Sequence, residues 1–268
     1  MGVSPATSSN YSSSLSALNS ESWALKDAKV TDEVLESLAG RTDLVIRAVD
    51  APLSTISAKT LKLFVKAHDS NLERFNLQNN NEIDGATLVD LAKMMPHLKT
   101  LSFQYLHQVT DEDLLKVVNA CQDLETLRIC QNSRISKEAF YQILNLDRNF
   151  LKLSVDLAGR QKKTSGASGA DREVRAQVEA LRLSGLSFGS SDIDPILKIK
   201  GLRNVELALT SVTAEDVARI SEGQLGVTVQ DISPKKLSGF EKGFIERGLS
   251  YTRSGRNIRV VQGASEGL

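Results

Sequence analysis

Residues 98–103 read Leu-Lys-Thr-Leu-Ser-Phe, and residues 124–129, 26 positions later, read Leu-Glu-Thr-Leu-Arg-Ile. At the same interval each stretch is followed by a β-branched residue and a hydroxyl residue, Val109-Thr110 and Ile135-Ser136. A self-similar unit of this length is typical of a repeat protein. The repeat therefore decides how the rest of the chain is interpreted.

Six apolar positions recur in three consecutive units. They are Leu72, Phe75, Leu77, Ile83, Leu88 and Leu91; then Leu98, Leu101, Phe103, Val109, Leu114 and Val117; then Leu124, Leu127, Ile129, Ile135, Phe140 and Ile143. The early positions alternate as in a β-strand and the later ones follow helical i, i+3 spacing, so each unit is predicted to be a short strand followed by a helix. Neither element can bury its apolar face alone, which predicts an α/β solenoid with one shared core.

The predicted helices begin at residues that suit a helix N-terminus. These are Thr31, Ser57, Asp84, Thr110, Ser136 and Thr213. Each directly follows a β-branched residue, and its side-chain oxygen can accept a hydrogen bond from the first turn of the helix. Acidic residues one or two places later favour the positive end of the helix dipole. We interpret these side chains as structural caps.

The unit from 124 to 136 reads L-x-x-L-x-I-x-x-N-x-x-I-S, and the unit from 72 to 84 reads L-x-x-F-x-L-x-x-N-x-x-I-D. This pattern resembles the leucine-rich repeats of the ribonuclease-inhibitor-like class, and most closely the cysteine-containing repeats of F-box proteins and some bacterial effectors. Cys121 stands where that subtype often carries cysteine, whereas Leu106 departs from its polar ninth position. The resemblance implies an α/β leucine-rich-repeat solenoid with a curved parallel sheet on the concave side and helices on the convex side.

Three regions are expected along the chain. Residues 1–22 are serine-rich and are predicted to be a disordered tail, residues 23–262 form the leucine-rich-repeat domain, and residues 263–268 form a C-terminal tail. The helix expected after Val155 is missing, and the polar, glycine-rich stretch near 158–172 is predicted to be a loop insertion.

Degraded repeat units are expected on both sides of the three clear ones. Strands are predicted around 44–46, 178–183, 202–207 and 225–229. A closing helix over 235–248 and a last strand over 258–261 are predicted to cap the array.

Composition argues against several classes of function. The 33 basic and 33 acidic residues cancel, which favours neither nucleic acid nor an anionic membrane as partner. Two cysteines and three histidines form no disulfide framework and show no metal-ligand spacing. The Lys162–Gly166 stretch has phosphate-loop residue types in the wrong order, and no catalytic motif is present. We expect a monomeric, cytoplasmic protein that is not an enzyme and has no cofactor, metal or catalytic residue.

The outward positions of the predicted strands form a polar face, because alternate strand residues point to opposite sides of a sheet. The predicted partner-binding residues are Arg74, Asn76, Gln78, Gln104, Tyr105, Arg128, Lys152, Asp156, Arg182 and Glu206. Their four cations suggest a mild basic stripe, and Tyr105 is a candidate aromatic anchor.

The favoured interpretation is a scaffold that binds another protein on this face. In families that the chain resembles, the face recognises a substrate for ubiquitin ligation when an F-box precedes the repeats. The segment before Val30 is too short and polar for an F-box, so direct recruitment to such a ligase is not expected. The alternatives are a secreted bacterial effector that acts on host proteins in the host cytoplasm, and a regulatory subunit of an enzyme.

Overall fold

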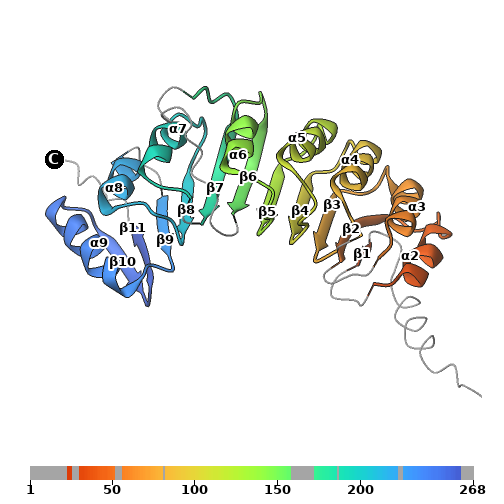
Figure 1. The fold of residues 1–268 in the computed structure, drawn as a ribbon, viewed down its shortest axis with the longest axis horizontal. Helices are drawn as coiled ribbons and strands as arrows, with labels where there is room; N and C mark the ends of the chain where they lie inside the picture. Colours follow the sequence, from red (N-terminus) through yellow and green to blue (C-terminus); the bar gives the residue numbers. More distant parts are fainter. Residues whose placement is uncertain are drawn as a thin grey trace, which may run out of the picture.

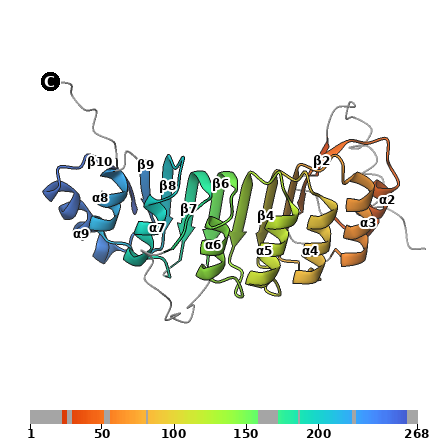
Figure 2. The same ribbon diagram turned by 90° about the horizontal axis from the view of Figure 1, so that it is seen from above.

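The computed structural model describes residues 23–25, 30–51, 56–80, 82–157, 172–185, 187–222 and 226–260. In these ranges an eleven-stranded sheet runs in the order β1-β2-β3-β4-β5-β6-β7-β8-β9-β11-β10. Neighbours from β1 to β9 pair in parallel, and β11 and β10 are added antiparallel. The strands line the inside of an arc and the helices cover its outside (Figure 1), and in Figure 2 the helices form a single layer along the sheet.

Strands and helices alternate from β1 to β6 and from β7 to β10. The strands are β1 (Trp23–Leu25), β2 (Ile46–Ala51), β3 (Arg74–Gln78), β4 (Thr100–Gln104), β5 (Thr126–Cys130), β6 (Asn149–Asp156), β7 (Gln177–Ser184), β8 (Asn204–Ala208), β9 (Gly226–Gln230), β10 (Tyr251–Ser254) and β11 (Asn257–Val260). The helices are α2 (Asp32–Ala39), α3 (Ala58–His68), α4 (Gly85–Met94), α5 (Asp111–Ala120), α6 (Lys137–Leu144), the 3-10 helix η2 (Ser190–Asp192), α7 (Ile193–Leu197), α8 (Ala214–Glu222) and α9 (Pro234–Glu246).

The 26-residue repeat sets the register of the parallel strands, because residues 26 positions apart lie side by side on neighbouring strands. Phe75 lies beside Leu101, Leu101 beside Leu127, and Leu127 beside Leu153 in the parallel ladder. These side chains are buried and stack in one layer of the core. The fold is a leucine-rich-repeat solenoid. The predicted fold class is confirmed by this topology.

The predicted helix caps are confirmed. Thr110 accepts a hydrogen bond at Oγ1 from the Asp113 backbone N–H (3.3 Å), and the Asp113 carboxylate accepts from the Thr110 N–H (3.0 Å). Thr213 and Asp216 repeat this reciprocal pair at the start of α8. At α4, Asp84 accepts from the Thr87 N–H at 2.8 Å, and this hydrogen bond lowers the pKa of the Asp84 carboxyl. Thr31, Ser57 and Ser136 cap α2, α3 and α6.

The polar ninth position of a unit supports backbone rather than a ligand. Asn132 is fully buried, its Oδ1 accepts from the Leu106 N–H at 2.7 Å, and its Nδ2 donates to the Cys130 carbonyl at 2.9 Å. Asn80 is also fully buried, and its Nδ2 donates to the Ile56 carbonyl of the preceding unit at 3.2 Å. Leucine can therefore occupy the ninth position at Leu106, because the backbone N–H of Leu106 donates its hydrogen bond to Asn132 of the next unit.

The ends of the array differ from the sequence prediction in detail. The closing helix (α9) and last strand (β11) are present, but β11 is antiparallel and forms a hairpin with β10, which periodicity could not indicate. Strand β1, helix α7 and the late start of β2 at Ile46 were also not predicted, because these elements are short or lack the repeat pattern. The predicted tails (1–22 and 263–268) and all of the predicted insertion (158–172) except Arg172 lie outside the described residues. No helix in the described part of the chain is long and apolar enough to cross a membrane.

Replacing Leu127 by Ala should lower the free energy of unfolding by about 2–5 kcal/mol, because its fully buried side chain contributes to a stacked layer of the core. Chemical denaturation followed by circular dichroism measures the change. The control is Leu63→Ala on α3, where the leucine is 50% exposed and the same substitution should cost at most about 0.5 kcal/mol. Equal stability of the two variants would contradict the register.

Candidate binding face

Strand register arranges the outward side chains of the concave face in three rows. The first row runs Arg74, Thr100, Thr126, Lys152, Ala180, Asn204; the second runs Asn76, Ser102, Arg128, Ser154, Arg182, Glu206; the third runs Gln78, Gln104, Cys130, Asp156, Ser184. Nine of the ten predicted site residues fall in these rows, and Tyr105 lies one residue beyond β4. Parallel pairing thus brings together residues up to 132 positions apart in sequence, from Arg74 to Glu206.

The centre of the face is a hollow of about 490 Å³, which we call the basic hollow. Its ionisable lining residues are Arg74, Arg128, Lys152 and Arg182, and its hydroxyl lining residues are Thr100, Ser102, Thr126 and Ser154. In the first row Thr100 and Thr126 lie between Arg74 and Lys152. In the second row Ser102 lies between Asn76 and Arg128, and Ser154 lies between Arg128 and Arg182. The hollow is therefore a hydroxyl floor surrounded by cations.

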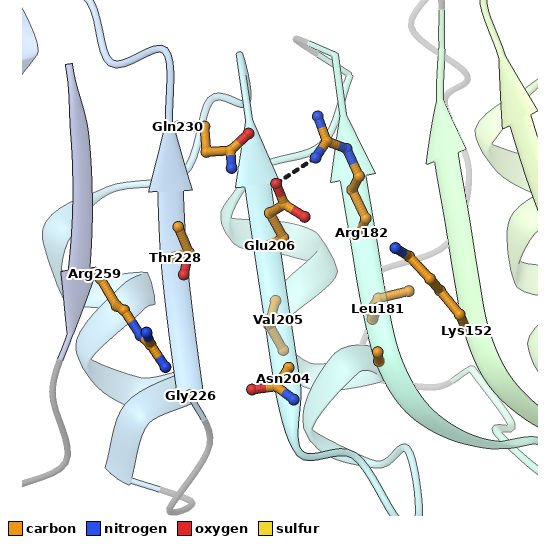
Figure 3. A pocket seen from close by; sticks show the side chains of 11 residues that line it. Lys152, Leu181, Arg182, Asn204, Val205, Glu206, Gly226, Thr228, Gln230 and Arg259 are labelled. Carbon is orange, nitrogen blue, oxygen red and sulfur yellow. Dashed lines mark hydrogen bonds and ion pairs between the residues drawn. The ribbon is translucent and has the colours of Figure 1, made fainter. Parts of the chain in front are cut away.

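A second hollow of about 340 Å³ lies toward the C-terminal end of the sheet. Figure 3 shows the Lys152 side chain extending toward β7 and the Arg182 guanidinium turned to the Glu206 carboxylate on β8. Arg182 and Glu206 form a close ion pair, and Arg259 enters the hollow from β11. Glu206 neutralises Arg182, so the second hollow has mixed charge, with Lys152 and Arg259 as its further cations.

Asn76 also lines the basic hollow, and the remaining predicted residues lie outside both hollows. Three of them, Gln78, Gln104 and Asp156, belong to the third row, at the carboxyl ends of the strands. Gln78 pairs in register with Gln104, and Asp156 pairs with Cys130. Tyr105 has a positive φ of 57°, is half-buried, and packs its ring 6.0 Å from that of His107. These residues border the hollows rather than line them.

The structure adds residues that the sequence did not single out as a site. The hydroxyl floor occupies outward positions of the clear repeats, so the repeat itself could have indicated it. Arg259 could not be found in this way, because it reaches the face through the antiparallel β11, where it pairs with Thr228.

Neither cysteine is placed for nucleophilic chemistry. Cys121 is fully buried at the end of α5, and burial raises the pKa of its thiol to about 11. Cys130 is buried at the end of β5, where its Sγ accepts from Arg128 Nε at 3.2 Å. Across the described ranges no group of His, Cys, Asp or Glu could hold a metal ion.

A buried polar cluster lies on the helical side, between α6 and the segment that starts at Arg172. Asp192 is 2% exposed, accepts a hydrogen bond from the Tyr141 hydroxyl, and pairs with Lys137 at 3.0 Å. Arg172 lies 4.0 Å over the Tyr141 ring and pairs with Glu138 at 2.8 Å. Burial and Asp192 raise the pKa of the Tyr141 hydroxyl, and Arg172 lowers the pKa of the Glu138 carboxyl. This cluster fastens η2 and the residues after 171 to α6.

No protein-family model matches the chain. Over 175 residues, 65% of this chain, the sequence is 26% identical to an Arabidopsis thaliana protein described as paired amphipathic helix protein Sin3-like 2, and the chain spans 12% of that protein's length. A crystal structure of a TLR13–ssRNA13 complex aligns with a TM-score of 0.37 and 14% identity, over 69% of this chain and 28% of the other.

The Cys121 thiol should be alkylated by iodoacetamide at pH 7.5 at least about 100-fold more slowly than a free cysteine, because only the thiolate reacts and burial disfavours it. Mass spectrometry of the labelled peptide measures the rate. In denaturant the rate should rise to that of an exposed thiol. Rapid labelling of Cys121 in the native protein would contradict its placement in the core.

Proposed function

We propose that the protein is a non-enzymatic interaction scaffold that binds a partner protein on its concave strand face. The observation that carries this proposal is the face itself, a continuous array of polar and cationic side chains presented in register by neighbouring strands. A leucine-rich-repeat solenoid gives such a face a curved, extended shape that suits a macromolecular surface. Its two hollows are lined by side chains with many hydrogen-bond donors, as in the polar part of a protein interface.

Arg128 is the central contact in this proposal. It lies on β5, is exposed, and lines the basic hollow between Ser102 and Ser154 of the neighbouring strands. Arginine is enriched among interface residues that contribute strongly to affinity, because its planar fork makes several hydrogen bonds and is weakly hydrated. The other proposed contacts are Arg74, Asn76, Gln78, Gln104, Tyr105, Lys152, Asp156, Arg182 and Glu206.

A finer assignment rests on the form of the repeat. The strand–helix unit of 26 residues, with a buried asparagine at its ninth position, supports the ribonuclease-inhibitor-like class. In the F-box proteins that such repeats resemble, the concave face recognises a substrate for ubiquitin ligation, and a cytoplasmic substrate-recognition subunit is the finer role that we infer from this resemblance. The effector and enzyme-regulator alternatives would use the same concave face, so identification of the partner separates them.

Reversing Arg128 to Glu should weaken partner binding at least about tenfold, equivalent to about 1.4 kcal/mol, because the change places a negative charge at the centre of the contact surface. The partner is first captured from native cells on the intact protein, and its affinity is then measured by calorimetry. The fold should be unaffected, because Arg128 is exposed.

The matched control is Lys59→Glu on the helical side. Lys59 is exposed in the first turn of α3, where an acidic residue suits the helix dipole, so the fold should be retained. Because this position lies outside the proposed contact surface and salt screens its charge, affinity should stay within about twofold. Lys137 would be a poor control, because its ammonium pairs with the buried Asp192. A partner that is sensitive to Lys59→Glu and indifferent to Arg128→Glu would bind the convex side and refute the proposal.

A further inference from the structure

The basic hollow gathers positive charge. Among the lining residues whose side chains the structure describes there are four cations and no carboxylate. Arg182 pairs with Glu206, which belongs to the second hollow, whereas Arg74, Arg128 and Lys152 form no ion pair with any side chain that the structure describes. Several cations elsewhere on the molecule do have acidic partners, as at Arg47–Glu73 and Arg219–Asp194. The hollow is therefore suited to an anionic group from another molecule.

The floor of the hollow supplies directional donors at short range. Thr100 and Thr126 occupy the two first-row positions between Arg74 and Lys152. In the second row, Ser102 and Ser154 flank Arg128 on its two sides. Adjacent strands are about 4.8 Å apart, so Arg74 and Lys152 start about 14 Å from each other and their long side chains can close on one group between them.

This combination matches the oxygens of a phosphate monoester better than those of a carboxylate. A phosphorylated side chain carries nearly two negative charges and three acceptor oxygens in a tetrahedral arrangement. One arginine fork can already satisfy both oxygens of a carboxylate, so a carboxylate would leave the hydroxyls of the half-buried Thr100, Ser102 and Thr126 unused in recognition. Several cations around a hydroxyl floor can satisfy all three phosphate oxygens at once, and clusters of arginines are a recurrent means of phosphopeptide recognition.

The shape of the face indicates that the phosphate is borne by a protein segment. The basic hollow, at about 490 Å³, is larger than a phosphate group requires. It continues through Lys152 and Arg182, which line both hollows, into the second hollow with its mixed charges at Glu206 and Arg259. Residues on either side of a phosphorylated side chain can therefore lie along the rows.

We propose that the basic hollow binds a phosphorylated serine or threonine side chain of the partner protein, with Arg74, Arg128 and Lys152 around the phosphate and Thr100 and Thr126 beneath it. This inference rests on the proposed function, because it specifies the chemistry that the concave face recognises. It also makes binding dependent on a kinase and a phosphatase that act on the partner.

The test uses the intact chain and three pools of nine-residue peptides with random flanks and a fixed central residue: phosphoserine, serine or glutamate. Fluorescence polarisation measures the affinity for each pool at 150 mM salt. The phosphoserine pool should bind at least about tenfold more tightly than the glutamate pool, and the serine pool should bind most weakly. Arg128→Glu should abolish the preference, and Lys59→Glu should preserve it.

The hydroxyl floor is tested without any change in charge. Thr126→Val keeps the shape and strand propensity of the side chain and removes its hydroxyl, so affinity for the phosphoserine pool should fall at least about threefold while affinity for the glutamate pool is unchanged. Thr126→Ser restores the hydroxyl and should restore binding, which separates recognition from loss of folding. Thermal unfolding of both variants verifies that the fold is retained.

Each contrary result identifies a different error. Equal affinity for the phosphoserine and glutamate pools would overturn the phosphate assignment and leave the proposed function intact as recognition of an acidic segment. Equal affinity for free phosphoserine and for the phosphoserine pool would overturn the peptide assignment. A single-stranded RNA oligonucleotide that bound more tightly than the phosphoserine pool and depended on Arg128 would overturn both this inference and the proposed protein partner.

Discussion

The parallel register between strands of equal-length units is the constraint on which the rest of the structure depends. From β2 to β6 every paired residue lies beside the one 26 positions later, as Ala48 beside Arg74 and Thr126 beside Lys152. Inward apolar residues must therefore stack on their counterparts, and outward residues must line up in rows. A change of one residue in register would turn every core side chain toward solvent.

The register survives where the unit length does not. Lys152 lies beside Ala180, 28 residues on, and Ala180 lies beside Asn204, 24 residues on. Differences in length are absorbed on the helical side, where α7 has only five residues and the Asp192 cluster fastens the segment after 171 to α6. The concave face consequently remains continuous across a part of the chain in which the sequence repeat has faded.

The two sides of the sheet use charge differently. On the helical side carboxylates cap helices or pair with neighbouring cations, as at Asp84 and Glu138, and their lowered pKa values reflect those contacts. Among the cations that line the basic hollow, Arg182 forms an ion pair with Glu206, and the other three form no ion pair with a described side chain. A chain with zero formal net charge can thus present a locally basic surface at this hollow.

The sequence by itself determined the strand–helix unit, its inward core, its helix caps and the outward position of residues such as Arg74 and Arg128, because periodicity and capping are local properties of the chain. It could not determine that Arg182 is paired with Glu206, since that contact joins two strands whose spacing departs from the repeat. Nor could it place Arg259 on the face, because an antiparallel hairpin brings it there. Only the tertiary structure decided how these outward side chains are directed and which of them pair, because side-chain direction and contacts between strands arise from packing between units and not from any one of them.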